Sequence, residues 1–226
     1  MLPIWLRLQA MVWPIILVSQ AMAALPMPWA FLPAVIAVSF LTLCTLLRAV
    51  RTAADVVTIV RMAGLLAVGY SVPSDVPLAA WSSLLALVLL DLVDGALARR
   101  FGGTAEGAIL DMEADQFTVL LLALLIVRGG GPSFVLLAPG IRYVFVLAMW
   151  AARLPAHDPK PVNGDNRRGR LCCAFVVTAL LAALFPGMPA TAVGLLSAAA
   201  VAVLVWSFSS DARFLLSRLR PSRAAR

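Results

Sequence analysis

Four aspartates within one apolar stretch of this chain have the type and spacing to do chemistry. They are Asp91, Asp94, Asp111 and Asp115. Carboxylates are costly in apolar surroundings, so a cluster of them requires a partner that neutralises their charge. Hard divalent ions such as Mg²⁺ or Mn²⁺ suit a set of oxygen ligands. The cluster therefore predicts a divalent-metal site, of the kind that supports chemistry on a diphosphate.

The first two aspartates share one helix face with two small residues. Asp91, Asp94, Gly95 and Ala98 recur at positions i, i+3, i+4 and i+7, which is the spacing of one side of an α-helix. Glycine and alanine keep that side open, so a bulky ligand can approach the backbone closely. We therefore expect a roomy ligand site beside the carboxylates.

The other two aspartates belong to a second helix. Gly107, Asp111 and Asp115 recur at i, i+4 and i+8, and a turn over residues 99–104 separates them from the first helix. Two antiparallel helices joined by that turn would bring the four carboxylates together. Four facing carboxylates cannot all stay ionised without a cation, so the pairing of the helices also predicts bound metal.

At this point the sequence resembles a known family. The pattern D-x2-D-G-x2-A-R-x7-G-x3-D-x3-D is similar to the signature of the CDP-alcohol phosphotransferases. Its fixed positions are all present, as Asp91, Asp94, Gly95, Ala98, Arg99, Gly107, Asp111 and Asp115. Chance placement of polar helix ends facing solvent is a poor explanation for so long a match.

The resemblance implies a role for each fixed position. The four aspartates would bind two divalent ions, Mg²⁺ or Mn²⁺, which hold the donor diphosphate. Asp115 would also act as the base that takes the acceptor proton. Gly95, Ala98 and Gly107 would line the cytidine site, with Arg99 near it.

The implied activity is that of an integral-membrane transferase in phospholipid biosynthesis. It would move a substituted phosphate from a CDP-linked donor to the hydroxyl of an acceptor alcohol, with release of CMP. The donor in bacterial relatives is usually CDP-diacylglycerol. The sequence leaves glycerol 3-phosphate, inositol phosphate, serine and another lipid alcohol open as acceptors. Relatives are commonly dimers, which makes a homodimer a candidate assembly.

Composition places the chain in a membrane. Of its 226 residues, 62% are hydrophobic and 13% are charged, whereas a soluble domain is nearer half apolar and a quarter charged. The predicted fold is an all-α, polytopic membrane helix bundle. We expect a two-span extension over residues 1–54, a six-helix catalytic core over 55–212 and a basic tail over 213–226. The predicted spans are residues 8–24, 28–47, 55–72, 77–99, 105–127, 133–153, 169–185 and 189–210.

The start of the first core helix partly follows the family pattern Pro-Asn-x-x-Thr-x-x-Arg. Thr58 and Arg61 match it, while Ala54 and Asp55 replace the proline and the asparagine. Asp55 could serve as the helix N-cap. Arg61 could bind a phosphate or pair with an aspartate, and the sequence does not choose between these roles.

Three further arginines predict an anion site. Arg142 lies about nine residues inside its span, and an arginine inside a membrane needs a cavity or a negative partner. Arg168 and Arg170 begin the seventh span. Together the three could bind the phosphate of a phosphorylated acceptor, although positive-inside charge alone also explains the last two.

The basic residues also predict topology. With an even number of spans they fall on one side of the membrane, and only Arg128 falls on the other. Basic loops stay cytoplasmic, so we expect the active site to face the cytosol from the cytoplasmic (inner) membrane. The net charge of +7 suits anionic lipid, and we expect no nucleic acid partner. The residues on the cytosolic side are Arg7, Arg48, Arg51, Arg99, Arg100, Arg153, Lys160, Arg167, Arg168, Arg170, Arg213, Arg218, Arg220, Arg223 and Arg226.

Other readings remain open from the sequence. A cation transporter or channel would also use the carboxylates, but it does not explain the fixed glycines, alanine and arginine. A non-catalytic membrane protein could have kept the motif by descent. Residues 1–23 resemble a cleavable signal peptide, although we favour an uncleaved span. Cys44, Cys172 and Cys173 are expected to be core thiols, and His157 a solvated side chain.

Overall fold

The computed structural model describes residues 2–22, 28–48, 50–151 and 167–219, and over these the chain forms eight α-helices. This confirms the predicted all-α polytopic bundle. The helices are α1 (Leu2–Ala21), α2 (Phe31–Leu47), α3 (Ala53–Ser71), α4 (Leu78–Phe101), α5 (Ala105–Arg128), α6 (Leu137–Ala151), α7 (Arg167–Ala183) and α8 (Ala190–Leu219), with a short 3-10 turn η1 (Ser133–Leu136) before α6.

Five of the described helices are long and apolar enough to cross a membrane: α1, α3, α4, the η1–α6 unit and the first 21 residues of α8. Helix α2 is equally apolar but has 17 residues. Helices α5 and α7 fall outside this set because α5 carries acidic residues in its first half and the 17-residue α7 begins with arginines. These charges belong to the polar end of the bundle, where the aspartates lie.

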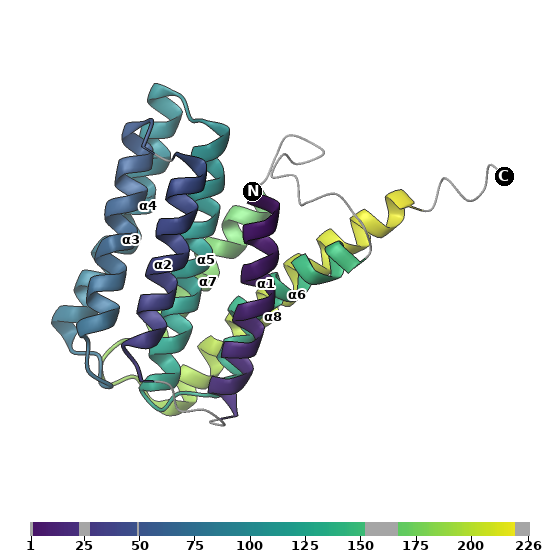
Figure 1. Cartoon of the computed structure of the whole chain (residues 1–226). Helices are drawn as coiled ribbons and strands as arrows, with labels where there is room; N and C mark the ends of the chain where they lie inside the picture. Colours follow the sequence, from purple (N-terminus) through teal and green to yellow (C-terminus); the bar gives the residue numbers. More distant parts are fainter. Residues whose placement is uncertain (1, 23–27, 49, 152–166, 220–226) are drawn as a thin grey trace.

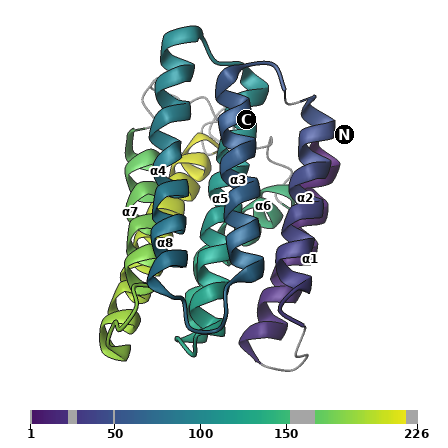
Figure 2. The ribbon, with the colours of Figure 1, turned by 90° about the vertical axis from the view of Figure 1, so that its left-hand side faces the viewer.

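Helix α3 packs against both α4 and α5, whereas α4 and α5 do not pack directly on each other. Figures 1 and 2 show the three helices running alongside one another. Glycines allow the close approach. A Cβ atom at Gly64 would lie 2.5 Å from Leu87 of α4, and one at Gly69 would lie 2.8 Å from Leu121 of α5.

Helix α1 packs against α6, helix α2 packs against α5 and α3, and α1 and α2 also contact each other. Phe117 of α5 is the centre of this packing, with edge-on contacts to Trp5, Trp13 and Phe40. Trp13 also stacks on Tyr143 of α6. Helices α1 and α2, which make up the predicted two-span extension, thus contribute to the same continuous hydrophobic core as the other helices. That residues 1–54 form an extension to a six-helix catalytic core stays a prediction.

The helix ends differ from the predicted spans at both chain ends. Helix α1 begins at Leu2 rather than near residue 8, because Pro3 is well suited to a first helical turn. Helix α8 runs to Leu219, into the predicted basic tail. No glycine or proline occurs between residues 195 and 220, so nothing local ends the helix earlier.

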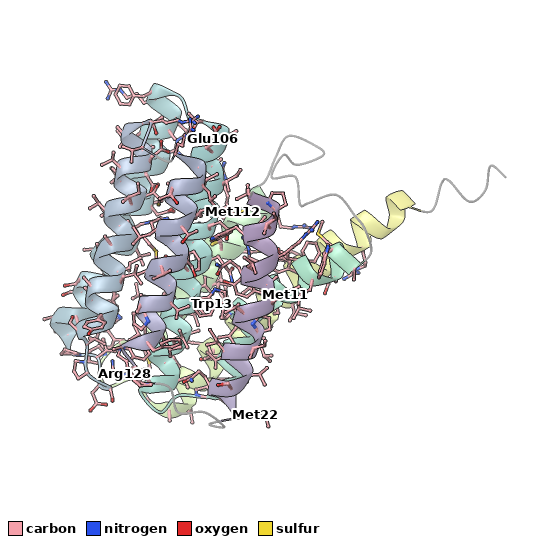
Figure 3. The ribbon with its side chains drawn as sticks, in the orientation of Figure 1. Met11, Trp13, Met22, Glu106, Met112 and Arg128 are labelled. Carbon is pink, nitrogen blue, oxygen red and sulfur yellow. The ribbon has the colours of Figure 1, made fainter. Side chains whose placement is uncertain are left out.

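The two ends of the bundle carry different residues. Figure 3 places Glu106 at one end, and Arg128 and Met22 at the other. At its end of the bundle, Arg128 donates a hydrogen bond to the carbonyl oxygen of Val72 at 2.5 Å, and its guanidinium group lies over the ring of Trp29. Several residues of the predicted cytosolic side lie outside the described residues: Arg153, His157, Lys160, Arg220, Arg223 and Arg226.

Candidate active site

The start of α3 is fixed by a capping box, and this determines where its polar residues lie. Thr52 is the N-cap, and its hydroxyl accepts from the Asp55 amide at 3.2 Å. Asp55 accepts in return from the Thr52 amide at 2.8 Å. The expectation that Asp55 is the N-cap was wrong, because it occupies the third helical position of the box. Thr58 and Arg61 follow one and two turns deeper on the same helix.

The start of α5 is packed against the start of α3. Thr104 caps α5 by accepting from the Gly107 amide at 2.9 Å. A Cβ atom at Gly107 would lie 2.5 Å from Oδ1 of Asp55, so only glycine permits this approach. Asp111 and Asp115 follow at intervals of about one turn, which directs them toward α3.

All four motif aspartates converge on Arg61. Its Nη1 pairs with Asp91 Oδ1 and lies 3.8 Å from Asp94 Oδ2. Its Nη2 donates to Oδ1 of Asp111 at 3.2 Å and to Oδ1 of Asp115 at 3.1 Å. The sequence left two roles open for Arg61, and the structure places it among the aspartates. Arg61 thus links carboxylates of α4 with carboxylates of α5.

Asp94 lies deeper than the other three carboxylates. It is 4% exposed, and its Oδ2 lies 3.1 Å from the hydroxyl of Thr58. That hydroxyl is also 3.1 Å from the carbonyl oxygen of Ala54. Asp94 therefore lies at the buried side of the site, between Arg61 and Thr58.

The remaining three carboxylates fit a divalent ion. Asp91, Asp111 and Asp115 each offer an oxygen, and these oxygens lie within 4.8 Å of one another. Their side chains are 44%, 45% and 30% exposed. An accessible set of oxygen ligands at this spacing suits Mg²⁺ or Mn²⁺. That all four aspartates bind two ions stays a prediction.

The small-residue face of α4 lies beside this set. A Cβ atom at Gly95 would meet only the Nη1 atom of Arg99, at 3.3 Å. Ala98 is half-buried and Arg99 is exposed. The predicted nucleotide site over Gly95, Ala98 and Arg99 thus has an accessible surface, while Gly107 packs against α3.

The three predicted phosphate-binding arginines do not converge. Arg142 pairs with Glu113, whose side chain is buried between α5 and α6. Arg168 lies over the ring of Trp206, with 5.9 Å between its Cζ atom and the ring centroid. Arg170 lies near enough to Asp111 for an attractive electrostatic interaction. Only Arg170 is thus placed beside the aspartates.

The sequence analysis missed the contacts of two residues in this region. Cys173 was expected to be a core thiol, but its Sγ atom lies 3.7 Å from Oδ2 of Asp115. Glu113 was not singled out, although a glutamate within an apolar helix is itself a signal. A cysteine within an apolar run gives no comparable signal, since it packs like a small hydrophobic residue.

Comparison with known proteins supports the same segment. A family model described as CDP-alcohol phosphatidyltransferase matches residues 51–207. This range includes α3 to α7 and most of α8, with all four aspartates and Arg61. No curated protein and no solved structure matches the chain.

Proposed function

Because the chain belongs to the CDP-alcohol phosphatidyltransferase family, we propose that it transfers a phosphatidyl group from CDP-diacylglycerol to an alcohol and releases CMP. The family and the apolar helices make it a multi-pass membrane transferase. The observation that carries the proposal is the set of three accessible carboxylates, with oxygens within 4.8 Å of one another. Such a set is suited to a divalent ion bound to a diphosphate.

In this proposal the aspartates bind the metal ions, and the small-residue face of α4 binds the cytidine. Asp91, Asp94, Asp111 and Asp115 would hold two ions, Mg²⁺ or Mn²⁺, which when bound supply charge neutralisation for the diphosphate and its leaving group. Gly95 and Ala98 leave room for the cytidine, and Arg99 lies at its edge. Gly107 contributes indirectly, because it lets α5 begin against α3.

The reaction that we propose exchanges one phosphorus–oxygen bond for another. The hydroxyl oxygen of the acceptor forms a bond to the lipid-bearing phosphorus, and the bond from that phosphorus to the bridging oxygen breaks. CMP leaves with the electron pair of that bond. The hydroxyl proton passes to Asp115, which is partly exposed and is held by Arg61 on Oδ1 and by Cys173 on Oδ2.

A phosphorylated acceptor would need a cationic partner beside the aspartates. For a phosphorylated acceptor, Arg170 is the favoured anion partner because it interacts electrostatically with Asp111, whereas Arg168, two residues earlier in α7, lies over the ring of Trp206. The positive-inside distribution supports a site that faces the cytosol from the inner membrane. A homodimer remains the proposed assembly by family resemblance.

The decisive experiment is a CMP-release assay on the purified chain in detergent. CDP-diacylglycerol is supplied with Mg²⁺ or Mn²⁺ and with each candidate acceptor in turn, namely glycerol 3-phosphate, inositol phosphate, serine and a further lipid alcohol. We expect CMP release with one acceptor and none in EDTA. Full turnover in EDTA would remove the metal mechanism. A cation transporter or channel would move ions across vesicles without releasing CMP.

The role of Asp115 is tested by Asp115→Asn, which keeps the shape of the side chain. We expect turnover to fall by ~10²–10⁴, the usual contribution of a general acid–base group. The matched control is Asp75→Asn, an exposed aspartate in the loop between α3 and α4. Near wild-type turnover of Asp115→Asn would assign the base elsewhere.

A further inference from the structure

Arg61 occupies the position that a cation should occupy. It is 2% exposed, and its guanidinium group contacts carboxylates from both α4 and α5. Among the described residues its Nε atom, also buried, has no hydrogen-bond partner. A buried guanidinium with an unsatisfied donor is costly, so the contacts made by its two terminal nitrogens must hold it in place.

The charges around Arg61 do not balance. If the four aspartates are ionised, the Arg61 guanidinium neutralises one of four negative charges, and Arg170, which also attracts Asp111, still leaves an excess of negative charge. Because α4 and α5 do not pack directly on each other, these like charges would tend to separate the two helices. Arg61 opposes that separation, since Nη1 binds an aspartate of α4 and Nη2 binds two aspartates of α5.

Arg61 and a divalent ion also require the same ligands. The three carboxylates that could hold an ion are Asp91, Asp111 and Asp115. The same three carboxylates receive the terminal nitrogens of Arg61. A positive charge in hydrogen-bonding contact with those oxygens weakens the binding of a further cation to them.

We propose that Arg61 is a built-in cation that keeps the carboxylates assembled without metal and competes with the divalent ion for them. The inference rests on the metal-dependent function proposed above. It makes Arg61 a positioning residue that sets the metal affinity of the site and the stability of its metal-free form. A first ion would displace Arg61 from Asp91, Asp111 and Asp115, and Asp94, which lies 3.8 Å from Nη1, would stay the partner of Arg61 until a second ion binds.

The test compares Arg61→Gln with wild type in two measurements that do not depend on turnover. Mn²⁺ affinity is measured from the electron paramagnetic resonance signal of free Mn²⁺, and the Tm is measured in EDTA and in saturating Mn²⁺. We expect the Kd for Mn²⁺ to fall at least about tenfold, because a competing charge is removed. We expect the Tm in EDTA to fall by about 5–10 °C, and Mn²⁺ to restore it.

Arg51→Gln is the matched control. It removes an arginine near the start of α3 that pairs with Glu106 at 3.2 Å, outside the carboxylate cluster. We expect its Mn²⁺ affinity and its response to EDTA to match wild type. An equal gain in affinity in this variant would mean that general charge, not the position of Arg61, sets metal binding, and would overturn the inference.

The remaining outcomes separate the inference from the proposed function. Unchanged or weaker Mn²⁺ binding by folded Arg61→Gln overturns the inference alone. A wild-type chain that binds no Mn²⁺ removes the metal mechanism and the inference together. If Arg61→Gln does not fold in EDTA or in Mn²⁺, the test uses Arg61→Lys instead. Lysine keeps the positive charge but lacks the two terminal nitrogens with which arginine contacts carboxylates of both helices. Its Tm in EDTA should fall and recover in Mn²⁺, and a Tm equal to wild type in EDTA contradicts the inference.

Discussion

At the scale of single residues, Gly107 and Gly95 belong to one motif but differ in their surroundings. A Cβ atom at Gly107 would lie 2.5 Å from Asp55 Oδ1 and 3.0 Å from Thr104 Oγ1. The side chains of both residues are held by helix capping, Asp55 through its other oxygen Oδ2 and Thr104 through Oγ1. We therefore expect Gly107→Ala to push α5 away from α3 and to cost about 1–3 kcal/mol of stability. Thermal unfolding of the purified variant measures this loss.

Gly95→Ala is the comparison within the same motif. Its added methyl group would meet only the end of the flexible Arg99 side chain, so the fold should be unaffected. If Gly95 lines the cytidine site, this variant should instead raise the KM for the CDP-donor. Equal losses of stability in the two variants would contradict the difference in packing.

At the scale of helices, α5 and α6 are joined by the ion pair between Glu113 and Arg142. Glu113 is 2% exposed, so Arg142→Ala would leave a buried carboxylate without its partner. Breaking a buried pair in this way costs about 3–5 kcal/mol. We expect Arg142→Ala to lower the Tm strongly, and Glu113→Gln combined with Arg142→Gln to recover much of it.

The same variant tests the role predicted for Arg142 from the sequence. If Arg142 binds an acceptor phosphate, Arg142→Ala should raise the acceptor KM far more than the donor KM, by roughly 10- to 150-fold. Its pairing with Glu113 favours the structural role. A normal Tm together with a selectively raised acceptor KM would restore the sequence-based prediction.

At the scale of the whole molecule, the charged residues determine the predicted orientation. Arg51 and Glu106 lie at the end of the bundle that carries the aspartates, and Arg128 lies at the opposite end. Positive residues favour the cytoplasmic side. A reporter fused after Arg226 should therefore report a cytosolic location in a bacterial host.

The companion measurement is a reporter placed in the loop between α3 and α4, for example after Asp75. With the aspartate end in the cytosol, this loop should lie on the opposite side. A cytosolic signal after Asp75 combined with a periplasmic one after Arg226 would invert the topology. The active site would then face away from its nucleotide substrate.

The sequence by itself determined the class of fold and the family. Helical spacing and apolar composition depend on residues that are near one another in the chain. The eight helices and the pattern from Asp91 to Asp115 could therefore be recognised from the sequence alone. The family match over residues 51–207 confirms that reading. The N-cap of α3 could not be read in the same way, because Thr52 and Asp55 both have side chains that can cap a helix.

Only the tertiary structure decided which side chains meet. The packing of α3 against both α4 and α5 assigned Arg61 to the aspartates, and the packing of α6 on α5 gave Arg142 the partner Glu113. The approach of α7 brought Cys173 to Asp115. These contacts join residues that are between 29 and 58 positions apart. Such pairings depend on which helices pack together, and helical periodicity describes only one helix at a time.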